Sequence, residues 1–261
     1  VRLFADDTIL YHRSDDATTL QDDLLKLEHW EKTWDMEFHP QKCQHITFTR
    51  KTKPITVSLE LRSIIIPKTD KVKYLGVSLD SKLTMRSHTA AVITKTNSTL
   101  GFIRRNVTTK SREIKSTAYK QLARPILEYA SASWDSVVTT AEKELEAVQR
   151  RAARMVCNIR RTDLKTSTTG LLKTLGYETL SARRRTARLK QFSQYHHSED
   201  KTITNYLERA GATTLRRHAL QYRLPQSGSD HMLRSFFHRT VRDWNALPTG
   251  SRFLDPPRAA V

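Results

Sequence analysis

Residues 1–11 read VRLFADDTILY, an acidic pair set between two short runs of β-branched, aromatic and aliphatic side chains. Such runs favour extended strands, and a polar pair between them predicts a β-hairpin with Asp6 and Asp7 at its turn. Two adjacent carboxylates are costly to bury without a positive partner, and oxygen ligands of this kind suit Mg²⁺. The pair is therefore either a solvated turn or half of a metal site.

The residues that follow the acidic pair predict one helix and several strands. Apolar side chains recur at helical spacing over 20–34, and Pro40 is expected to end this helix. Alternation of apolar and polar residues predicts a strand over 44–49 and another over 55–61. A further apolar segment covers 72–79, and we expect it to pair antiparallel with 55–61.

Beyond residue 82 the apolar period becomes helical. The pattern predicts helices over 93–103, over 114–122 with an interruption at Pro125, and over 145–155. Three arginines lie off the apolar stripe of the third helix, where they either form a solvated face or contact phosphates. They are Arg150, Arg151 and Arg154.

The last hundred residues predict a further basic helix over 180–192, which carries a run of three arginines. The run consists of Arg183, Arg184 and Arg185. An aromatic cluster follows, and its rings either form the core of a small helical module, which we favour, or stack on bases of a single strand. Its members are Phe236, Phe237 and Trp244.

Charge separates the two parts of the chain. The 261 residues hold 45 Lys and Arg against 27 Asp and Glu, a net charge of +18, which is typical of proteins that meet polyanions. Residues 1–80 hold 12 basic and 13 acidic side chains, whereas residues 81–261 hold 33 and 14. The excess of positive charge is therefore confined to the second part.

The stretch Phe4-Ala5-Asp6-Asp7 resembles the aromatic-x-Asp-Asp motif of reverse transcriptases, in the form found in non-LTR (LINE-type) retrotransposons. Residues 36–43, MEFHPQKC, resemble the Phe-Asn-x-x-Lys-Cys segment that follows this motif, with His39 in place of the usual Asn. Residues 73–76, KYLG, resemble the strand and turn that support the primer terminus, and Gly76 would allow a backbone to approach closely.

Further segments resemble the same enzymes in the same order along the chain: residues 122–131, 148–154 and 236–248. The resemblance implies the C-terminal half of such a reverse transcriptase, with an α+β fold. It implies a partial palm of antiparallel hairpins and one helix over 1–82, an all-α thumb over 83–162, and a basic helical region with a loose tail over 163–261.

The resemblance also implies a reaction. These enzymes copy an RNA template by adding deoxynucleotides from their triphosphates to the 3′ end of a DNA primer, with two divalent ions. On this basis Asp6 and Asp7 are candidate catalytic and Mg²⁺-binding residues, and Lys42 is the candidate proton donor to pyrophosphate. Contacts with the primer and nucleotide would come from Phe4, Ala5, Tyr74, Leu75 and Gly76.

The family has a further metal-binding aspartate and the fingers upstream of this motif, whereas five residues precede Asp6 and the sequence begins at Val1 without Met. We therefore expect a fragment that is inactive alone. The alternative is a non-catalytic, basic nucleic-acid-binding module from a decayed element. Two cysteines and the lack of an apolar run near 18 residues predict a soluble, intracellular chain that does not enter membranes, in nucleus or cytoplasm.

Overall fold

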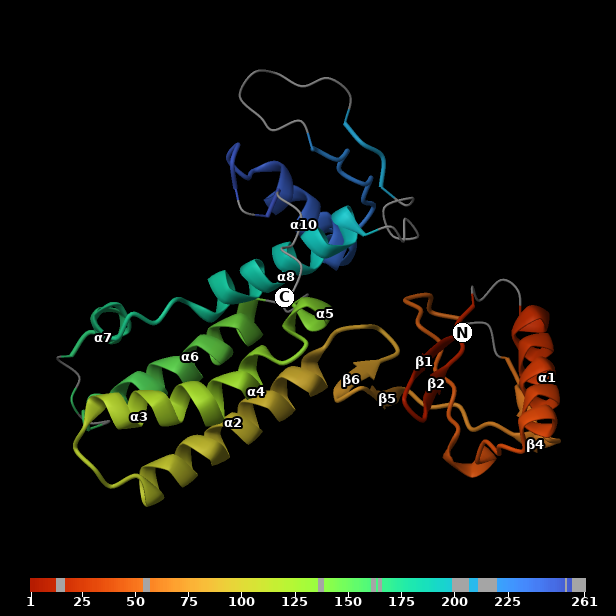
Figure 1. Cartoon of the computed structure of the whole chain (residues 1–261), viewed down its shortest axis with the longest axis horizontal. Helices are drawn as coiled ribbons and strands as arrows, with labels where there is room; N and C mark the ends of the chain where they lie inside the picture. Colours follow the sequence, from red (N-terminus) through yellow and green to blue (C-terminus); the bar gives the residue numbers. More distant parts are fainter. Residues whose placement is uncertain are drawn as a thin grey trace. The chain divides into compact units, whose positions relative to one another are not determined.

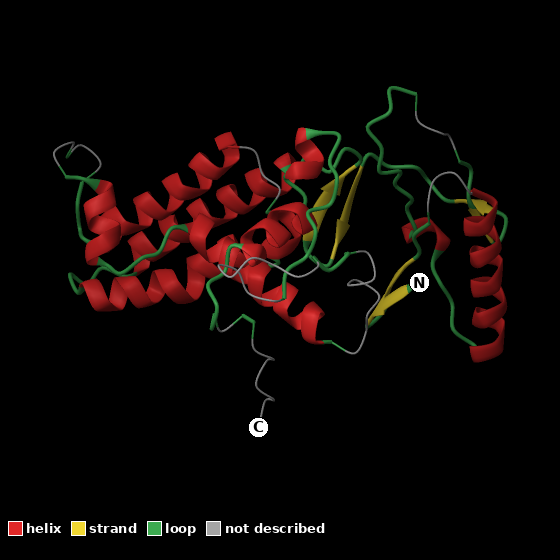
Figure 2. Cartoon of the chain, turned by 90° about the horizontal axis from the view of Figure 1, so that it is seen from above, coloured by secondary structure: helices red, strands yellow, loops and turns green. Residues whose placement is uncertain are grey.

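A computed structural model of the chain divides into two compact units, Val1–Thr84 and Met85–Val261. It combines helices with small antiparallel strand pairs, which confirms the expected α+β class (Figure 1, Figure 2). None of the helices it describes is long and apolar enough to cross a membrane. The structure describes residues 1–12, 17–53, 57–135, 139–160, 163, 166–198, 207–210, 220–251 and 253–254.

Three β-hairpins form separate two-stranded antiparallel sheets in the first unit, and each is closed by a two-residue turn. Their strands are β1 (Arg2–Phe4) with β2 (Asp7–Ile9), β3 (Glu60–Leu61) with β4 (Ile64–Ile65), and β5 (Lys71–Tyr74) with β6 (Val77–Asp80).

Two of these turns have both central residues at positive φ, the arrangement whose twist matches that of the flanking strands. Arg62 and Ser63 have φ of 53° and 61°, and Leu75 and Gly76 have φ of 44° and 81°. Only Gly76 among the four lacks a Cβ and adopts this conformation without steric cost. Neither turn has the sequence Asn-Gly or Asp-Gly, so the usual sequence signal for a two-residue hairpin turn is missing at both.

The expected pairing of 55–61 with 72–79 is wrong. Residues 72–79 fold back on themselves as β5 and β6, and Glu60–Leu61 pairs with Ile64–Ile65, because tight turns close each hairpin locally. The part of the predicted strand at 54–56 lies outside the described residues. The strand expected over 44–49 is also not formed, since only His45 makes a bridge, to Lys68.

Helix α1 (Ala17–Trp34) confirms the predicted helix, although Pro40 does not end it. Asp35 takes a left-handed φ of 52° directly after Trp34, and Pro40 instead begins the short 3₁₀ helix η1 (Pro40–Lys42). The core that this helix covers is small. Its buried members are Leu24, Leu59, Leu61 and Ile66.

The second unit is helical, and the helices predicted over 93–103, 114–122, 145–155 and 180–192 are all present. Helices α2, α4 and α6 pack together, and α8 packs against α10 (Figure 1). The bounds are α2 (Arg86–Asn106), α3 (Arg112–Ala118), π-helical η2 (Tyr119–Ala123), α4 (Arg124–Glu128), α5 (Ser131–Trp134), α6 (Thr139–Val156), α7 (Thr168–Thr174), α8 (Leu180–His197), α9 (Asp230–Leu233) and α10 (Phe236–Asn245).

The interruption predicted at Pro125 is the π-helical turn η2. Proline has no backbone N–H, so the carbonyl four residues before Pro125 loses its usual donor. The chain widens by one residue in this turn, and the N–H of Arg124 bonds the carbonyl of Tyr119. Helix α4 then continues from Arg124.

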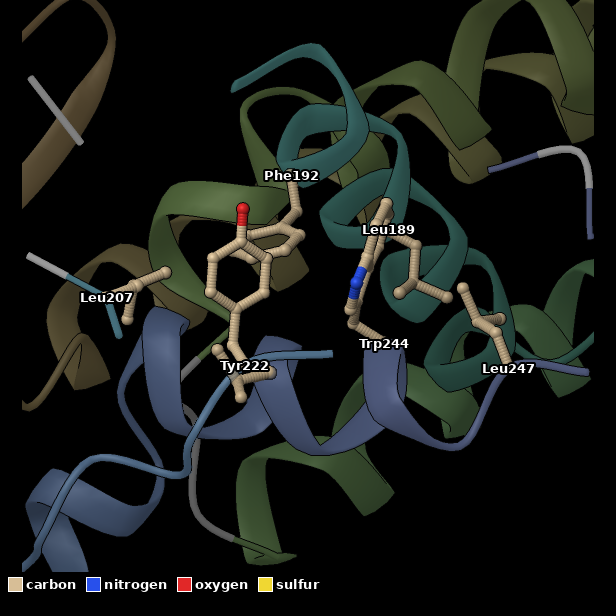
Figure 3. Close-up of a cluster of buried hydrophobic side chains, with 7 residues drawn as sticks. Leu189, Phe192, Leu207, Tyr222, Trp244 and Leu247 are labelled. Atoms are coloured by element: carbon tan, nitrogen blue, oxygen red, sulfur yellow. The ribbon is translucent and has the colours of Figure 1, made fainter. Parts of the chain in front are cut away.

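Aromatic rings form the core between α8 and α10 (Figure 3). The ring centroid of Phe192 lies 5.0 Å from that of Trp244 and 5.5 Å from that of Tyr222. Trp244 is fully buried, and its Nε1 donates to the carbonyl of Leu220 at 2.6 Å. Phe236 and Phe237 are partly buried against the same cluster, so the prediction of a structural core for these rings is confirmed.

Candidate functional site

The acidic pair lies where the sequence predicts it, at the tip of the first hairpin. Phe4 pairs with Asp7 across the two strands, so Ala5 and Asp6 form the turn, and Ala5 has a positive φ of 50°. Both carboxylates are exposed, and neither has a hydrogen bond or ion pair among the described residues. They are free to bind something that the chain itself does not supply.

The other candidate residues of the first unit also lie at exposed or half-buried ends of elements. Lys42 is the last residue of η1 and is exposed. Tyr74 ends β5 and is half-buried, and Leu75 and Gly76 form the turn that follows it. Within the described residues no sheet joins this turn to the Asp6 turn, because each hairpin is a sheet of its own.

Two of the three candidate arginines on α6 bond backbone carbonyls. The Arg150 Nη2 donates to the carbonyl of Lys143 at 3.4 Å, and the Arg154 Nη1 donates to that of Asp163 at 3.1 Å. Arg151 is exposed. Arg154 therefore helps to hold the segment after α6, whereas Arg151 offers its guanidinium to solvent.

The three consecutive arginines of α8 differ from one another. Arg183 makes two bonds to the carboxylate of Glu128, which raises its pKa. Arg185 is half exposed, and its Nε lies 3.0 Å from Asp243. Arg184 is 1% exposed, and its Nε donates to Asp135 at 2.7 Å. Burial thus removes Arg184 from the candidate phosphate contacts, because it already has a buried counter-ion.

Asp135 is a residue that sequence reasoning missed. It is 4% exposed and is met by guanidinium groups from two helices, Arg184 and Arg188 of α8 and Arg239 of α10. In the sequence, a lone acid directly after a tryptophan in a basic region is only a weak signal of a buried ion pair. The i, i+4 spacing of Arg184 and Arg188 is the better one, because it puts both guanidinium groups on one helix face.

Comparison with known proteins agrees with the sequence resemblance. Residues 1–79 match the family described as reverse transcriptase (RNA-dependent DNA polymerase). The chain is 30% identical over 161 residues to the probable RNA-directed DNA polymerase from transposon BS of Drosophila melanogaster, a match over 59% of this chain. It is 28% identical over 161 residues, again 59% of this chain, to the probable RNA-directed DNA polymerase from transposon X-element of the same species.

A third relative is the RNA-directed DNA polymerase from mobile element jockey of Drosophila funebris, 27% identical over 167 residues, which are 60% of this chain. In each case the match spans 18% of the relative's length. No solved structure matches significantly. The similarity to reverse transcriptases of non-LTR retrotransposons, expected from the motifs, is confirmed.

Proposed function

We propose that this chain is part of an RNA-directed DNA polymerase of a non-LTR retrotransposon, with palm residues in 1–82, a thumb in 83–162 and a basic helical region in 163–261. One observation carries the proposal. In the segment that matches the reverse transcriptase family, the hairpin β1–β2 presents Asp6 and Asp7 as exposed carboxylates with no partner among the described residues. Exposed carboxylates also occur on solvated turns, and the place of this pair in the segment that matches the family is what supports a chemical role.

The donor set fits a divalent cation. Mg²⁺ prefers oxygen ligands and is commonly held by one or two carboxylates together with waters and substrate phosphates, which is what an exposed Asp pair offers. In the proposed site Asp6 is the direct ligand, with Asp7 beside it. When bound, the ions lower the pKa of the primer 3′ hydroxyl and neutralise charge that develops on the leaving pyrophosphate.

The remaining candidate residues position the reactants. Phe4 and Ala5 border the acidic turn and would lie under the primer end, and Tyr74, Leu75 and Gly76 would contact the primer backbone. The 3′ hydroxyl would lose its proton to solvent as its oxygen bonds the α-phosphorus, and the bond from that phosphorus to the pyrophosphate oxygen would break. The Lys42 ammonium would donate a proton to this leaving oxygen. An exposed, flexible lysine can serve this purpose.

Template and primer would be bound largely by the basic helices. Among the predicted contacts we retain those with exposed or half-buried guanidinium groups: Arg150, Arg151, Arg154, Arg183 and Arg185. Arg184 is left out for the reason given above. For such contacts the logarithm of the binding constant falls linearly with the logarithm of salt concentration, because binding releases the counter-ions condensed on the phosphates.

We propose further that the 261 residues alone bind nucleic acid without extending a primer. Among the described residues there is no group of three or more His, Cys, Asp or Glu side chains that could hold a metal ion, and two carboxylates leave a two-ion centre short of ligands. The same observation favours the second candidate, a basic binding module from a decayed element.

Primer extension separates these possibilities. The chain is assayed with an RNA template, a DNA primer, deoxynucleotides and Mg²⁺, first alone and then as a chimera in which it replaces the matching segment of the BS transposon polymerase. We expect binding without extension by the chain alone and extension by the chimera. Extension by the chain alone would overturn the proposal that the 261 residues do not extend a primer. An inactive but folded chimera would favour the binding module from a decayed element.

A further inference from the structure

The second unit contains a pocket that the proposed polymerase chemistry does not use. It lies between α8 and α10 and has a volume of about 370 Å³. Four arginines line it together with Thr179 and Asp243, and each helix contributes two of them at i, i+3 spacing. The arginines are Arg185 and Arg188 on α8 and Arg239 and Arg242 on α10.

Arg188, which lines the pocket, has one hydrogen-bond donor without an acceptor. Its side chain is almost fully buried, with one terminal nitrogen bonded to Asp135 and the other 2.6 Å from Asp243. Its Nε is buried and has no hydrogen-bond partner. A buried guanidinium N–H without an acceptor costs free energy, but this nitrogen is enclosed by the protein, and the arginines that a ligand in the pocket can reach are the exposed Arg185 and Arg242.

The charges around the pocket are also unequal. Among the described residues, five guanidinium groups, those of Arg184 and the four lining arginines, face three carboxylates. The carboxylates are those of Asp135, Asp243 and Glu142. Burial lowers the pKa of Arg239, and the neighbouring Arg188 lowers it further, in spite of the attraction of Asp135. Glu146 also lies at the edge of the pocket, where its carboxylate accepts from the backbone N–H of Ser181, and the guanidinium groups still outnumber the carboxylates.

We propose that this pocket binds a dianionic phosphate group. Guanidinium forks match the paired oxygens of phosphate, and the excess of arginines over carboxylates around the pocket would attract the negative charge of a phosphate monoester. The shared chemistry is found in inorganic phosphate and in the 5′ end of a nucleic-acid strand. The inference rests on the geometry of α8 and α10 and goes beyond the polymerase proposal.

The test uses the full 261-residue chain and calorimetric titration with three probes: inorganic phosphate, a short 5′-phosphorylated oligonucleotide, and the same oligonucleotide with a 5′ hydroxyl. The double variant Arg185→Gln/Arg242→Gln removes two pocket charges from exposed side chains and leaves the buried Arg188 in place. The matched control, Lys190→Gln/Arg234→Gln, removes two charges from exposed side chains that do not line the pocket.

We expect the pocket variant to lose about tenfold or more in phosphate affinity and the control to stay within about twofold of the original chain. Tighter binding of the phosphorylated strand than of the hydroxyl strand would identify a strand end as the source. Equal binding of the two strands, with phosphate still bound, would identify a small phosphate. No saturable phosphate binding at millimolar concentration, or equal losses in both variants, would overturn the proposal.

Should the double variant fail to fold by circular dichroism, Arg242→Gln alone provides the same test. Arg242 is exposed, and the structure shows no ion pair of its guanidinium with a described residue. A loss of about threefold or more in phosphate affinity supports the pocket, whereas unchanged affinity contradicts it.

Discussion

The candidate carboxylates of the first unit and a candidate arginine of the second lie in opposite environments. In Val1–Thr84 the acidic pair is exposed at the end of a hairpin, with Asp6 in the turn and Asp7 as the first residue of β2, and neither carboxylate makes a bond within the described residues. In Met85–Val261 the candidate Arg184 is buried against Asp135. The comparison teaches that charged residues chosen from sequence alone can lie in opposite environments, in solvent for Asp6 and Asp7 and in a buried ion pair for Arg184.

The largest expected effect on stability belongs to the buried network of the second unit. Replacing Asp135→Ala leaves the guanidinium groups of α8 and α10 without their shared counter-ion, and we expect a loss of about 5 kcal/mol in the free energy of unfolding. Urea denaturation measures it. The control Glu144→Gln, an exposed acid on α6, should change stability by less than about 0.5 kcal/mol. Similar small effects for both would show that Asp135 does not hold the helices together.

One tryptophan in each unit allows a second comparison, between a buried and an exposed side chain. Trp244 is fully buried among Phe192 and Tyr222, so Trp244→Ala should cost about 3–4 kcal/mol. Trp34, at the end of α1, is 66% exposed, and Trp34→Ala should cost no more than about 0.5 kcal/mol. Thermal or urea unfolding of the two variants provides the comparison, and a larger loss for Trp34→Ala would contradict the packing described.

Sequence patterns predicted the helical unit better than the hairpin unit. The period of apolar residues located α2, α6 and α8, because a long amphipathic helix repeats its signal over several turns. Strand pairing was predicted wrongly, because a two-residue turn such as Arg62-Ser63 gives no signal when neither residue is Gly, Asn or Asp. The one turn with a glycine, Leu75-Gly76, was recognised through the family motif rather than as a hairpin turn.

The sequence predicted which residues belong to the candidate site but not the burial or ion-pair partners of each one. Sequence reasoning placed Asp6 and Asp7 at a turn, since an acidic pair between two apolar runs is a local signal. It could not separate Arg184 from Arg185, because their carboxylate partners, Asp135 and Asp243, are 49 and 58 residues distant from them along the chain. Contacts of this kind are set by tertiary packing, and the i, i+4 spacing of Arg184 and Arg188 indicates a shared helix face without identifying the partner acid.

An ion pair in the first unit predicts an acid-sensitive stability. The Arg62 guanidinium bonds the buried Glu31 and lowers the pKa of that carboxyl. Since an unfolded Glu titrates near 4.5, the stabilisation is complete above that pH and is lost as pH falls through the lowered pKa. Arg62→Gln should lower the free energy of unfolding at pH 7, by an amount that water screening limits because Arg62 is 35% exposed.

The measurement for this pair is urea denaturation of the Arg62→Gln variant at pH 7 and at pH 3. The difference from the original chain should shrink at the lower pH, because unfolded Glu31 is protonated below about 4.5 and the stabilisation falls as the pH decreases from there. Arg50→Gln, an exposed charge of the same unit, is the control. A loss that is equal at both pH values would show that the pair does not contribute through its charge.

Replacing two glycines by alanine should have the smallest effects on stability, and the two effects should have opposite signs. Gly76 has a φ of 81° in the β5–β6 turn, so Gly76→Ala should destabilise by about 1 kcal/mol. Gly101 lies inside α2, where an added Cβ would come no closer than 3.4 Å to the flexible end of Arg105, so Gly101→Ala should stabilise by about 0.5–1 kcal/mol. Melting temperatures that shift in the same direction would contradict one of the two backbone assignments.

The most direct test of the central claim, that the exposed acidic pair supports chemistry rather than folding, is RNA-templated primer extension by the BS chimera carrying Asp6→Asn. We predict a loss of at least about 10³-fold in extension rate with an unchanged melting temperature. The matched change Asp22→Asn, on the exposed face of α1, should leave the rate within about twofold. Equal rates for the two variants would contradict the account.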